Sequence, residues 1–545
     1  MSGTLVLPFN DRRQLGEFIF FGGILLLAAS LPLSKFGMSL AQFIMAGGWI
    51  ISGNLNMKFQ RVLRQPVVWA LWSLFFVHIA GLIYTSDLKE GLADLRIKLP
   101  LFLLPLFFAS VPPLSAKKYR TVLIVLISAT VISTLASLGY YLGILEAEIK
   151  DIRDVSRFIS HIRLSLLVCF SFAGIVWFLR KEKRALRRVI LSLLLFWLVC
   201  FLILMESLTG LGILLAGTLV FTLRQLFTSP TLTAKVFAYV IIGVLLFSTY
   251  RLSKFVFVES VEPLLVQQDT LPVYTRLGHP YRHDLRQQEL ENGNLVWLYL
   301  NEQELDSTWR IRSEINMYNA DRKGHMLQMT LMRYLTALGY TKDADGVAKL
   351  TDAQVREIEN GVANPDDNQL SNLPARIRKL AWEYRIYYFG GDPSGHSLTQ
   401  RIEYWKTAWH LIKQAPLFGC GSGDMKQEYE NAYKETGSLL EPSWRLLSHN
   451  QYLRIGVALG SMGFAVFMFS LFFPWFYLHK YGDILYSAFL FIALASMLTE
   501  DTLETQAGVT FFAFLNAFFL FNDARTARYR PEDMPANYVN TGGAP

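Results

Sequence analysis

Charged residues and cysteines are scarce in this chain. Of its 545 residues, only 18% are charged while 52% are hydrophobic. A typical soluble domain carries about 25% charged residues, so a wholly water-soluble protein is excluded. The three cysteines, Cys169, Cys200 and Cys420, are too few and too far apart for a disulfide framework or a cysteine-based metal site.

The sequence also lacks a cleavable signal peptide and metal-ligand spacing. No small-residue cleavage site follows the first apolar run, which leads directly into a second one, so we expect an uncleaved anchor. No cluster of histidines, cysteines and acids has the spacing of a metal site, so no metal is expected. The net charge of +8 comes from cations in short loops between apolar runs, a pattern typical of membrane proteins rather than of nucleic-acid binding.

Long apolar runs dominate the rest of the chain, and many approach the roughly 20 residues that a helix needs to cross a bilayer. They predict an all-α membrane protein with about twelve transmembrane helices. The spans are expected near 15–33, 36–53, 66–84, 98–111, 120–145, 160–180, 187–206, 208–224, 235–257, 449–478, 483–499 and 503–522. Pro100 and Pro105 in the short fourth span indicate a broken or re-entrant segment.

Lysine and arginine in alternate loops predict the orientation. With twelve spans, all the strongly basic loops fall on one side, which we assign to the cytoplasm together with both termini. These cations are Arg12, Arg13, Lys58, Arg61, Arg64, Lys117, Lys118, Arg120, Arg180, Lys181, Lys183, Arg184, Arg187, Arg188, Arg525, Arg528 and Arg530.

The same pattern places one large polar segment outside the membrane. We therefore predict four regions: nine helices over 1–257, a mostly helical periplasmic loop over 258–447, three helices over 448–524, and a disordered cytoplasmic tail over 525–545. The large loop thus lies between the ninth and tenth helices.

Three features of the loop are readable from its sequence. Residues 350–361 predict a short polar helix that Gly361 terminates. A second helix is expected from Ser397 until Pro416, with one apolar face formed by Leu398, Ile402, Trp405, Trp409 and Ile412. The glycine-rich segment 418–424 lacks the third glycine and the preceding strand of a dinucleotide site, so it predicts a tight turn.

Four basic or titratable residues are expected on the outer side of the membrane: Lys98, Arg163, Arg401 and His449. Guanidinium and ammonium groups there suit a diphosphate, and a histidine can move a proton near neutral pH. Each also has a structural alternative, such as a cap, an exposed helix position or a cation reaching the headgroups. Arg163 lies one turn inside its span, where a charge is costly and usually functional. Possible supporting residues are Arg96, His161, Asn450 and Glu206.

The segment around His449 resembles a known family signature. It reads SHNQYLRIGVALGSMG, with nine residues between Asn450 and Gly460 and two more before Gly463. This is similar to the signature of the O-antigen ligase and polymerase superfamily. The stretch RIEYWKTAWHLIKQAPLFGCGSGD, which Arg401 begins, also resembles that family. So do the segments 84–108, 160–167 and 499–514.

The resemblance implies an enzyme of the bacterial inner membrane with a GT-C-like helical fold and a periplasmic active site. Such enzymes take a glycan from an undecaprenyl diphosphate carrier and need no cofactor, and a ligase attaches it to lipid A–core. His449 matches the essential histidine of the family and Arg401 its loop arginine, both expected to be catalytic, while Lys98 and Arg163 match other basic positions of the family. The resemblance implies that Arg401, Arg163 and Lys98 bind the diphosphate. The chain departs from the family at 207–212, SLTGLG, which lacks an arginine, and in an insertion over 280–395.

Other functions remain open from the sequence. An O-antigen polymerase that joins repeat units, or a protein O-glycan ligase, would carry the same basic residues. A transporter of lipid-linked saccharides would also suit twelve spans, although no repeat relates two halves of the chain. A non-enzymatic scaffold or receptor would use the loop only for binding.

Overall fold

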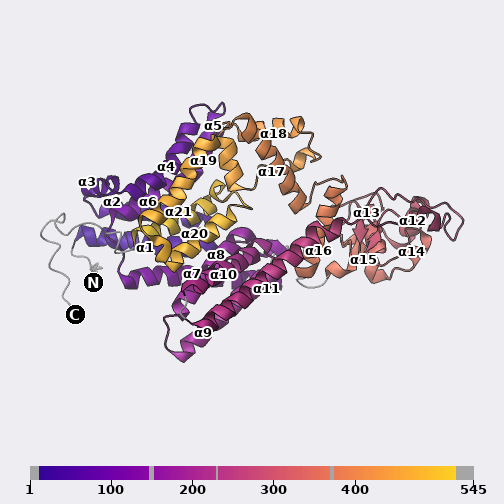
Figure 1. Ribbon diagram of the computed structural model, residues 1–545, viewed down its shortest axis with the longest axis horizontal. Coiled ribbons are helices and arrows are strands. Elements are labelled where there is room, and N and C mark those ends of the chain that lie inside the picture. Colours follow the sequence, from indigo (N-terminus) through magenta and orange to yellow (C-terminus); the bar gives the residue numbers. More distant parts are fainter. Residues whose placement is uncertain (1–10, 147–151, 229–230, 369–372, 523–545) are drawn as a thin grey trace, which may run out of the picture. The chain divides into compact units, whose positions relative to one another are not determined.

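The computed structural model of the chain describes residues 11–146, 152–228, 231–368 and 373–522, and it is mostly helical (Figure 1). The tail predicted over 525–545 lies outside these residues.

The helices are numbered in chain order. The N-terminal half contains α1 (Arg12–Leu33), α2 (Lys35–Ile51), α3 (Leu55–Leu63), α4 (Pro66–Gly81), α5 (Leu88–Lys98), α6 (Pro100–Ser110), α7 (Ala116–Tyr141), α8 (His161–Leu179), α9 (Ala185–Leu204), α10 (Leu208–Thr228) and α11 (Leu232–Phe257). Next come α12 (Glu302–Arg312), α13 (Leu327–Ala337), α14 (Ala344–Ala348), α15 (Asp352–Glu359), α16 (Leu373–Tyr388), α17 (Ser397–Gln414) and α18 (Met425–Glu435). The C-terminal helices are α19 (Gln451–Tyr477), α20 (Ile484–Ser496) and α21 (Gln506–Phe521).

Short 3₁₀ helices join several of these elements. They are η1 (Ile152–Val155), η2 (Glu259–Val261), η3 (Gln268–Thr270), η4 (Pro365–Asn368), η5 (Pro442–Trp444), η6 (Lys480–Gly482) and η7 (Thr502–Glu504). The only strands in the described part of the chain are β1 (Leu290–Glu291) and β2 (Asn294–Leu295), which pair antiparallel. This small hairpin is an addition to the all-helical fold that the sequence predicts.

Each of the twelve predicted spans overlaps a helix, but the helices differ in length. Among the described residues, six are long and apolar enough to cross a membrane, and the pair α2 and α3, bent by 113°, makes a seventh candidate. Four more apolar helices, α4, α20, α21 and part of α10, are shorter. The predicted fourth span is the 11-residue α6, about 16 Å long against a hydrocarbon core of about 30 Å. A multi-pass membrane protein is therefore supported, whereas twelve crossings remain a prediction.

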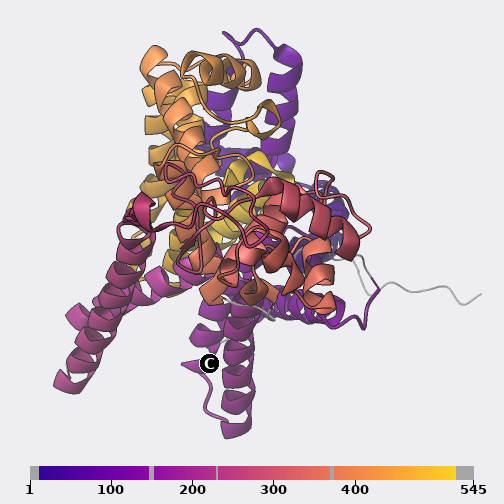
Figure 2. The ribbon, with the colours of Figure 1, turned by 90° about the vertical axis from the view of Figure 1, so that its right-hand side faces the viewer.

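The chain forms two compact units. The first contains residues 1–218, 404–437 and 446–545, and the second contains 219–403 and 438–445. In the first unit the C-terminal helices pack among the N-terminal ones: α19 lies against α4, and α21 lies against α6. Both ribbon views show these orange and yellow helices among the indigo ones (Figures 1 and 2). Segments that are hundreds of residues apart can therefore form one site.

The second unit has a hydrophobic core of its own. Trp309, Leu331 and Tyr334 are completely buried in it, together with residues of α12, α13 and α15. The predicted helix over 350–361 is confirmed as α15, which a capping box at Thr351 begins and Gly361 follows with φ +74°. This core explains how a polar insertion folds between apolar helices.

A break in α19 is filled by the glycine-rich turn. At Gly460 the backbone adopts φ 62° and ψ −164°, so the helical hydrogen bonds on either side are interrupted. The turn 416–421 replaces them. Its amides at Cys420 and Gly421 donate to the carbonyls of residues 457 and 458 at 2.9 Å, and its carbonyls at 416 and 417 accept from the amides of 461 and 462 at 2.8 and 3.2 Å. The expected tight turn over 418–424 is confirmed, and its role is structural.

The same turn is also held from the N-terminal half of the chain. The hydroxyl of Tyr84 donates to the carbonyl of Phe418 at 2.6 Å, and the Asp424 carboxylate accepts from the backbone amides of Ser86 and Asp87 at 2.8 Å. Residues 84–87, 416–424 and 457–462 are therefore one packed unit, although they are remote in sequence.

We expect Gly460→Ala to destabilise the protein by about 3 kcal/mol or more, because a left-handed backbone and a close contact combine there. A β-carbon at this position would lie 2.3 Å from the carbonyl carbon of Leu417. Gly22→Ala in α1 is the matched control, since nothing lies within 4 Å of a β-carbon there. Thermal midpoints in detergent would compare the two, and equal midpoints would contradict the role given to the break.

Candidate active site

His449 lies directly before the cap of α19, in an unusual backbone conformation. Its φ of +46° is in the left-handed region, which residues with side chains seldom adopt. Asn450 is the N-cap, and its side-chain oxygen accepts from the amide of Leu453 at 3.1 Å. Strained backbone that the surroundings hold in place tends to occur at functional sites.

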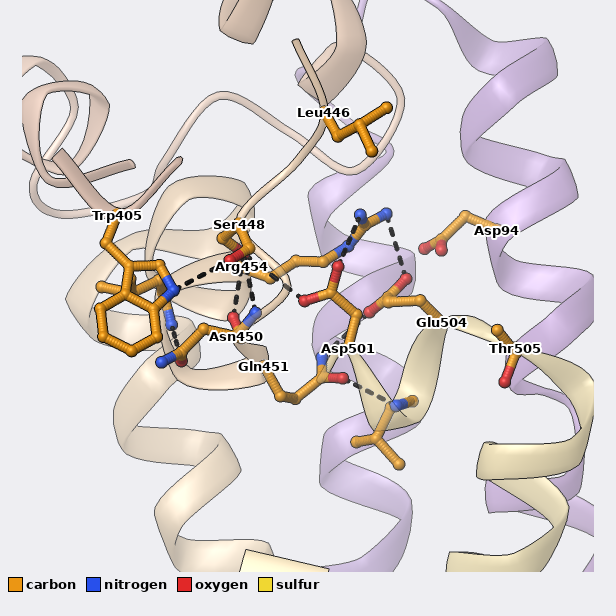
Figure 3. Close-up of polar contacts among 12 residues, drawn as sticks. Asp94, Trp405, Leu446, Ser448, Asn450, Gln451, Arg454, Asp501, Glu504 and Thr505 are labelled. Carbon is orange, nitrogen blue, oxygen red and sulfur yellow. Dashed lines mark hydrogen bonds and ion pairs between the residues drawn. The ribbon is translucent and has the colours of Figure 1, made fainter. Parts of the chain in front are cut away.

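The residues beside His449 are held by aromatic and hydroxyl groups. Trp405 donates its indole N–H to the carbonyl of Ser448 at 3.0 Å, and the hydroxyl of Ser448 donates to the carbonyl of Asn450 at 3.0 Å (Figure 3). The ring of Tyr404, which is buried, lies 5.7 Å from the imidazole ring of His449. The histidine itself is half-buried.

The predicted apolar face of α17 is covered only in part. Leu398, Ile402 and Ile412 are half-buried, whereas 36% of Trp405 and 54% of Trp409 are exposed. Tyr404, Ala408 and Leu411 are buried, so the helix also buries side chains beside the predicted face.

One turn connects α20 with α21 and contacts both residues that follow His449. We call residues 497–505 the acidic turn. Its Leu498 carbonyl accepts from the amide side chain of Asn450 at 2.9 Å, and its Leu503 amide donates to the side-chain oxygen of Gln451 at 2.7 Å. The turn therefore anchors the start of α19.

Glu504 is the central carboxylate of the acidic turn. It accepts from Lys98 at 2.8 Å and from the side chain of Gln451 at 3.0 Å, and it pairs with Arg454 at 3.2 Å. Burial alone would raise the pKa of Glu504, but Arg454 and Lys98 outweigh it and hold this pKa well below its usual range. We therefore treat Glu504 as ionised.

Lys98 is completely buried and paired with two acids. Besides Glu504 it contacts Asp94 at 2.5 Å, and the other oxygen of Asp94 lies 3.7 Å from His78. Burial and the neighbouring Glu504 together raise the pKa of Asp94 to about 6, although Lys98 opposes the shift. The structure thus places the charge of Lys98 between carboxylates.

Arg163 contacts the other end of the acidic turn. One guanidinium nitrogen, Nη2, donates to the carbonyl of Asp501 at 3.3 Å and to the hydroxyl of Thr505 at 3.2 Å. Its second nitrogen, Nη1, is buried and has no hydrogen-bond partner among the described residues. A buried donor of this kind is costly unless a ligand or water meets it.

Asp501 interacts electrostatically with Arg454, Arg163 and His449. Its carboxylate lies 3.7 Å from Arg454, and its carbonyl accepts from Arg163. Burial raises the pKa of Asp501, although the charges of Arg454 and His449 oppose this shift. Three cations and three acids therefore meet at the start of α19: Lys98, Arg163, Arg454, Asp94, Asp501 and Glu504.

The remaining predicted site residues lie at different places. Arg401 is in α17, in the part that belongs to the second unit. Arg96 is exposed on α5. His161 begins α8, and Glu206 lies in the turn before α10 with φ +48°. The structure thus brings Lys98, Arg163 and Asn450 together at the acidic turn, next to His449 in the chain.

Sequence reasoning missed Arg454, Gln451 and Glu504 as members of this cluster. Arg454 lies one turn inside an apolar span. A charge in such a position is costly and usually functional, and this argument, which selected Arg163, applies to Arg454 as well. The burial of Glu504 and Asp501 could not be predicted, since nothing local in the sequence reveals that the acidic turn is buried against α5 and α19.

A comparison with protein families identifies the segment that carries His449. Residues 366–468 match the model of a family described as O-antigen ligase. This stretch of the chain is therefore similar to the O-antigen ligase family. The O-antigen ligase segment covers α17, the glycine-rich turn, His449 and the break in α19, so the resemblance seen in these motifs is confirmed. No curated protein matches the chain.

The O-antigen ligase segment and the apolar helices together support a multi-pass membrane protein. They also support an enzyme of the glycan ligase or polymerase type, which acts on a lipid-linked glycan and an acceptor.

The raised pKa of Asp94 gives a pH test of the cluster. Because the folded-state pKa is about 6 and the ordinary value is 3.8, this carboxyl contributes stability at pH below about 4, and the contribution is lost as the pH rises through 6. We expect the thermal midpoint of the wild type to fall between pH 4 and 6 more than that of Asp94→Asn. Lys98, Glu504 and His78 face this group and are unchanged in the variant. Parallel pH profiles would refute the buried, protonatable state of Asp94.

Proposed function

We propose that the protein transfers a glycan from an undecaprenyl diphosphate carrier to an acceptor hydroxyl of lipid A–core, on the periplasmic face of the bacterial inner membrane. The observation that carries this proposal is the strained His449 within the O-antigen ligase segment, next to a buried cluster of arginines. The basic loops support the orientation, with both termini in the cytoplasm.

His449 would act as the general base. Its imidazole takes the proton of the acceptor hydroxyl, and the hydroxyl oxygen attacks the anomeric carbon of the glycan. The bond from that carbon to the diphosphate oxygen breaks, and its electron pair leaves with the lipid diphosphate. Because this leaving group is already good, cations that are in place before the reaction suffice to stabilise it.

Arg163 is the best-supported ligand for the diphosphate. Its buried Nη1 lacks a hydrogen-bond partner in the described chain, and guanidinium groups match phosphate oxygens. Lys98 was predicted for the same role, but its charge is shared by Asp94 and Glu504, so we propose that it acts through Glu504. Arg401 is proposed as a further diphosphate ligand and as a contributor to catalysis. Its helix α17 continues to Trp405, which bonds to the residue before His449.

The decisive test is transfer in vitro from purified carrier-linked glycan. His449→Ala should lower the rate by at least about 10²-fold while membrane levels stay normal. His410→Ala is the matched control, because His410 pairs with the exposed Glu435 and lies outside the cluster. A fully active His449→Ala variant would remove the base from the mechanism.

We also expect Arg163→Lys to lower kcat/KM for the lipid-linked donor by about 10-fold, and Arg163→Ala by about 10²-fold or more. A lysine keeps the charge but cannot supply N–H groups from separate nitrogens of one planar group. The exposed Arg188→Ala serves as the control. Wild-type kinetics in both Arg163 variants would show that another group binds the diphosphate.

The acceptor is tested by the lipopolysaccharide ladder of a deletion strain. Loss of all long glycan on lipid A–core indicates the proposed ligase. A single remaining repeat unit would indicate a polymerase, and an intact ladder with loss of protein-linked glycan a protein O-glycan ligase. A transporter would form no new glycosidic bond in vitro.

A further inference from the structure

Gln451 makes three hydrogen bonds to the acidic turn. Its side chain is completely buried. Its backbone amide donates to the carbonyl of Met497 at 2.9 Å. Its side-chain oxygen accepts from the amide of Leu503 at 2.7 Å, and its side-chain nitrogen donates to Glu504 at 3.0 Å. A single residue thus binds the acidic turn at three points.

Gln451 lies two residues after His449, whose backbone conformation needs support from its surroundings. His449 has φ +46°, and a residue with a side chain keeps such a conformation only where its surroundings determine it. On one side, Ser448 is held through its carbonyl by Trp405. On the other side, Asn450 binds the carbonyl of Leu498, and Gln451 follows.

We propose that Gln451 is a positioning residue for glycan transfer: through the acidic turn it fixes the backbone at His449 and so aims the imidazole at the acceptor. This inference rests on the proposed function, because it assumes that His449 is the base. Gln451 is not assigned any contact with substrate.

The chemistry of the position explains why a glutamine is required. The side chain must accept from the amide of Leu503 and donate to the carboxylate of Glu504 at the same time. Alanine would leave the Leu503 amide buried without its acceptor. Glutamate would keep that bond but would face the carboxylate of Glu504. Since Lys98 and Arg454 hold the other oxygen of Glu504, the acidic turn itself keeps its anchors.

Steady-state kinetics of the full-length protein in detergent separate positioning from binding. We expect Gln451→Ala to lower kcat by about 10- to 100-fold, with the KM for donor changed by less than about threefold, because a small misplacement of a catalytic group costs rate rather than affinity. Gln506→Ala is the matched control. Gln506 begins the next helix, bonds to Ser39 at 2.5 Å and has no bond to residues 448–451 among the described contacts, so its variant should stay within about twofold of the wild type. A wild-type kcat in Gln451→Ala overturns the proposal.

A charge swap tests the same contact if Gln451→Ala fails to accumulate. Gln451→Glu alone should be impaired, because two carboxylates then meet. The double variant Gln451→Glu with Glu504→Gln restores a donor facing an acceptor, so it should recover at least about tenfold of the lost kcat. A double variant no better than Gln451→Glu overturns the proposal.

His449→Ala, measured in the same assay, separates the proposed role of His449 as base from the positioning role of Gln451. If it retains activity, the proposed function of His449 fails, whatever Gln451 does. If it is inactive while Gln451→Ala has normal kcat, only the positioning inference fails.

Discussion

The buried carboxylate of Glu504 is the interaction on which the rest of the site depends. Burying a charge is expensive unless it is paired and hydrogen-bonded, and Glu504 receives Lys98 from α5 and both Gln451 and Arg454 from α19. Removing any one of these groups would leave another charge or donor without compensation. The carboxylate thereby joins α5, the start of α19 and the acidic turn.

The cluster as a whole is close to neutral when all its acids are ionised. Lys98, Arg163 and Arg454 balance Asp94, Asp501 and Glu504. This balance suits a site at the end of apolar helices, where an excess of either sign would be costly. It also means that a bound diphosphate would compete with the acids for the same cations, and the raised pKa values of Asp94 and Asp501 allow protonation to relieve that competition.

Much of the helical architecture could be predicted from the sequence, because apolar runs and turn residues act locally. The α15 helix, its end at Gly361, the start of α17 and the glycine-rich turn all follow from such signals. Arg163 stood out as a charge inside an apolar span, and His449 stood out through the family resemblance. The burial of the acidic turn and the membership of Gln451 and Lys98 in one cluster could not be predicted, since they depend on contacts between remote segments of the chain.

The break at Gly460 also bears on how the protein meets membranes of different thickness. Above it, the first turns of α19 are fastened to the glycine-rich turn and to the acidic turn; below it, an apolar stretch continues to Tyr477. Helices usually respond to a mismatch with the bilayer by tilting, and a tilt of an unbroken α19 would swing His449 with it. The glycine-rich turn also holds residues 461 and 462, so we expect only the stretch beyond them, as far as Tyr477, to follow the lipid while His449 keeps its position. One glycine would thus allow the two ends of α19 to tilt by different amounts.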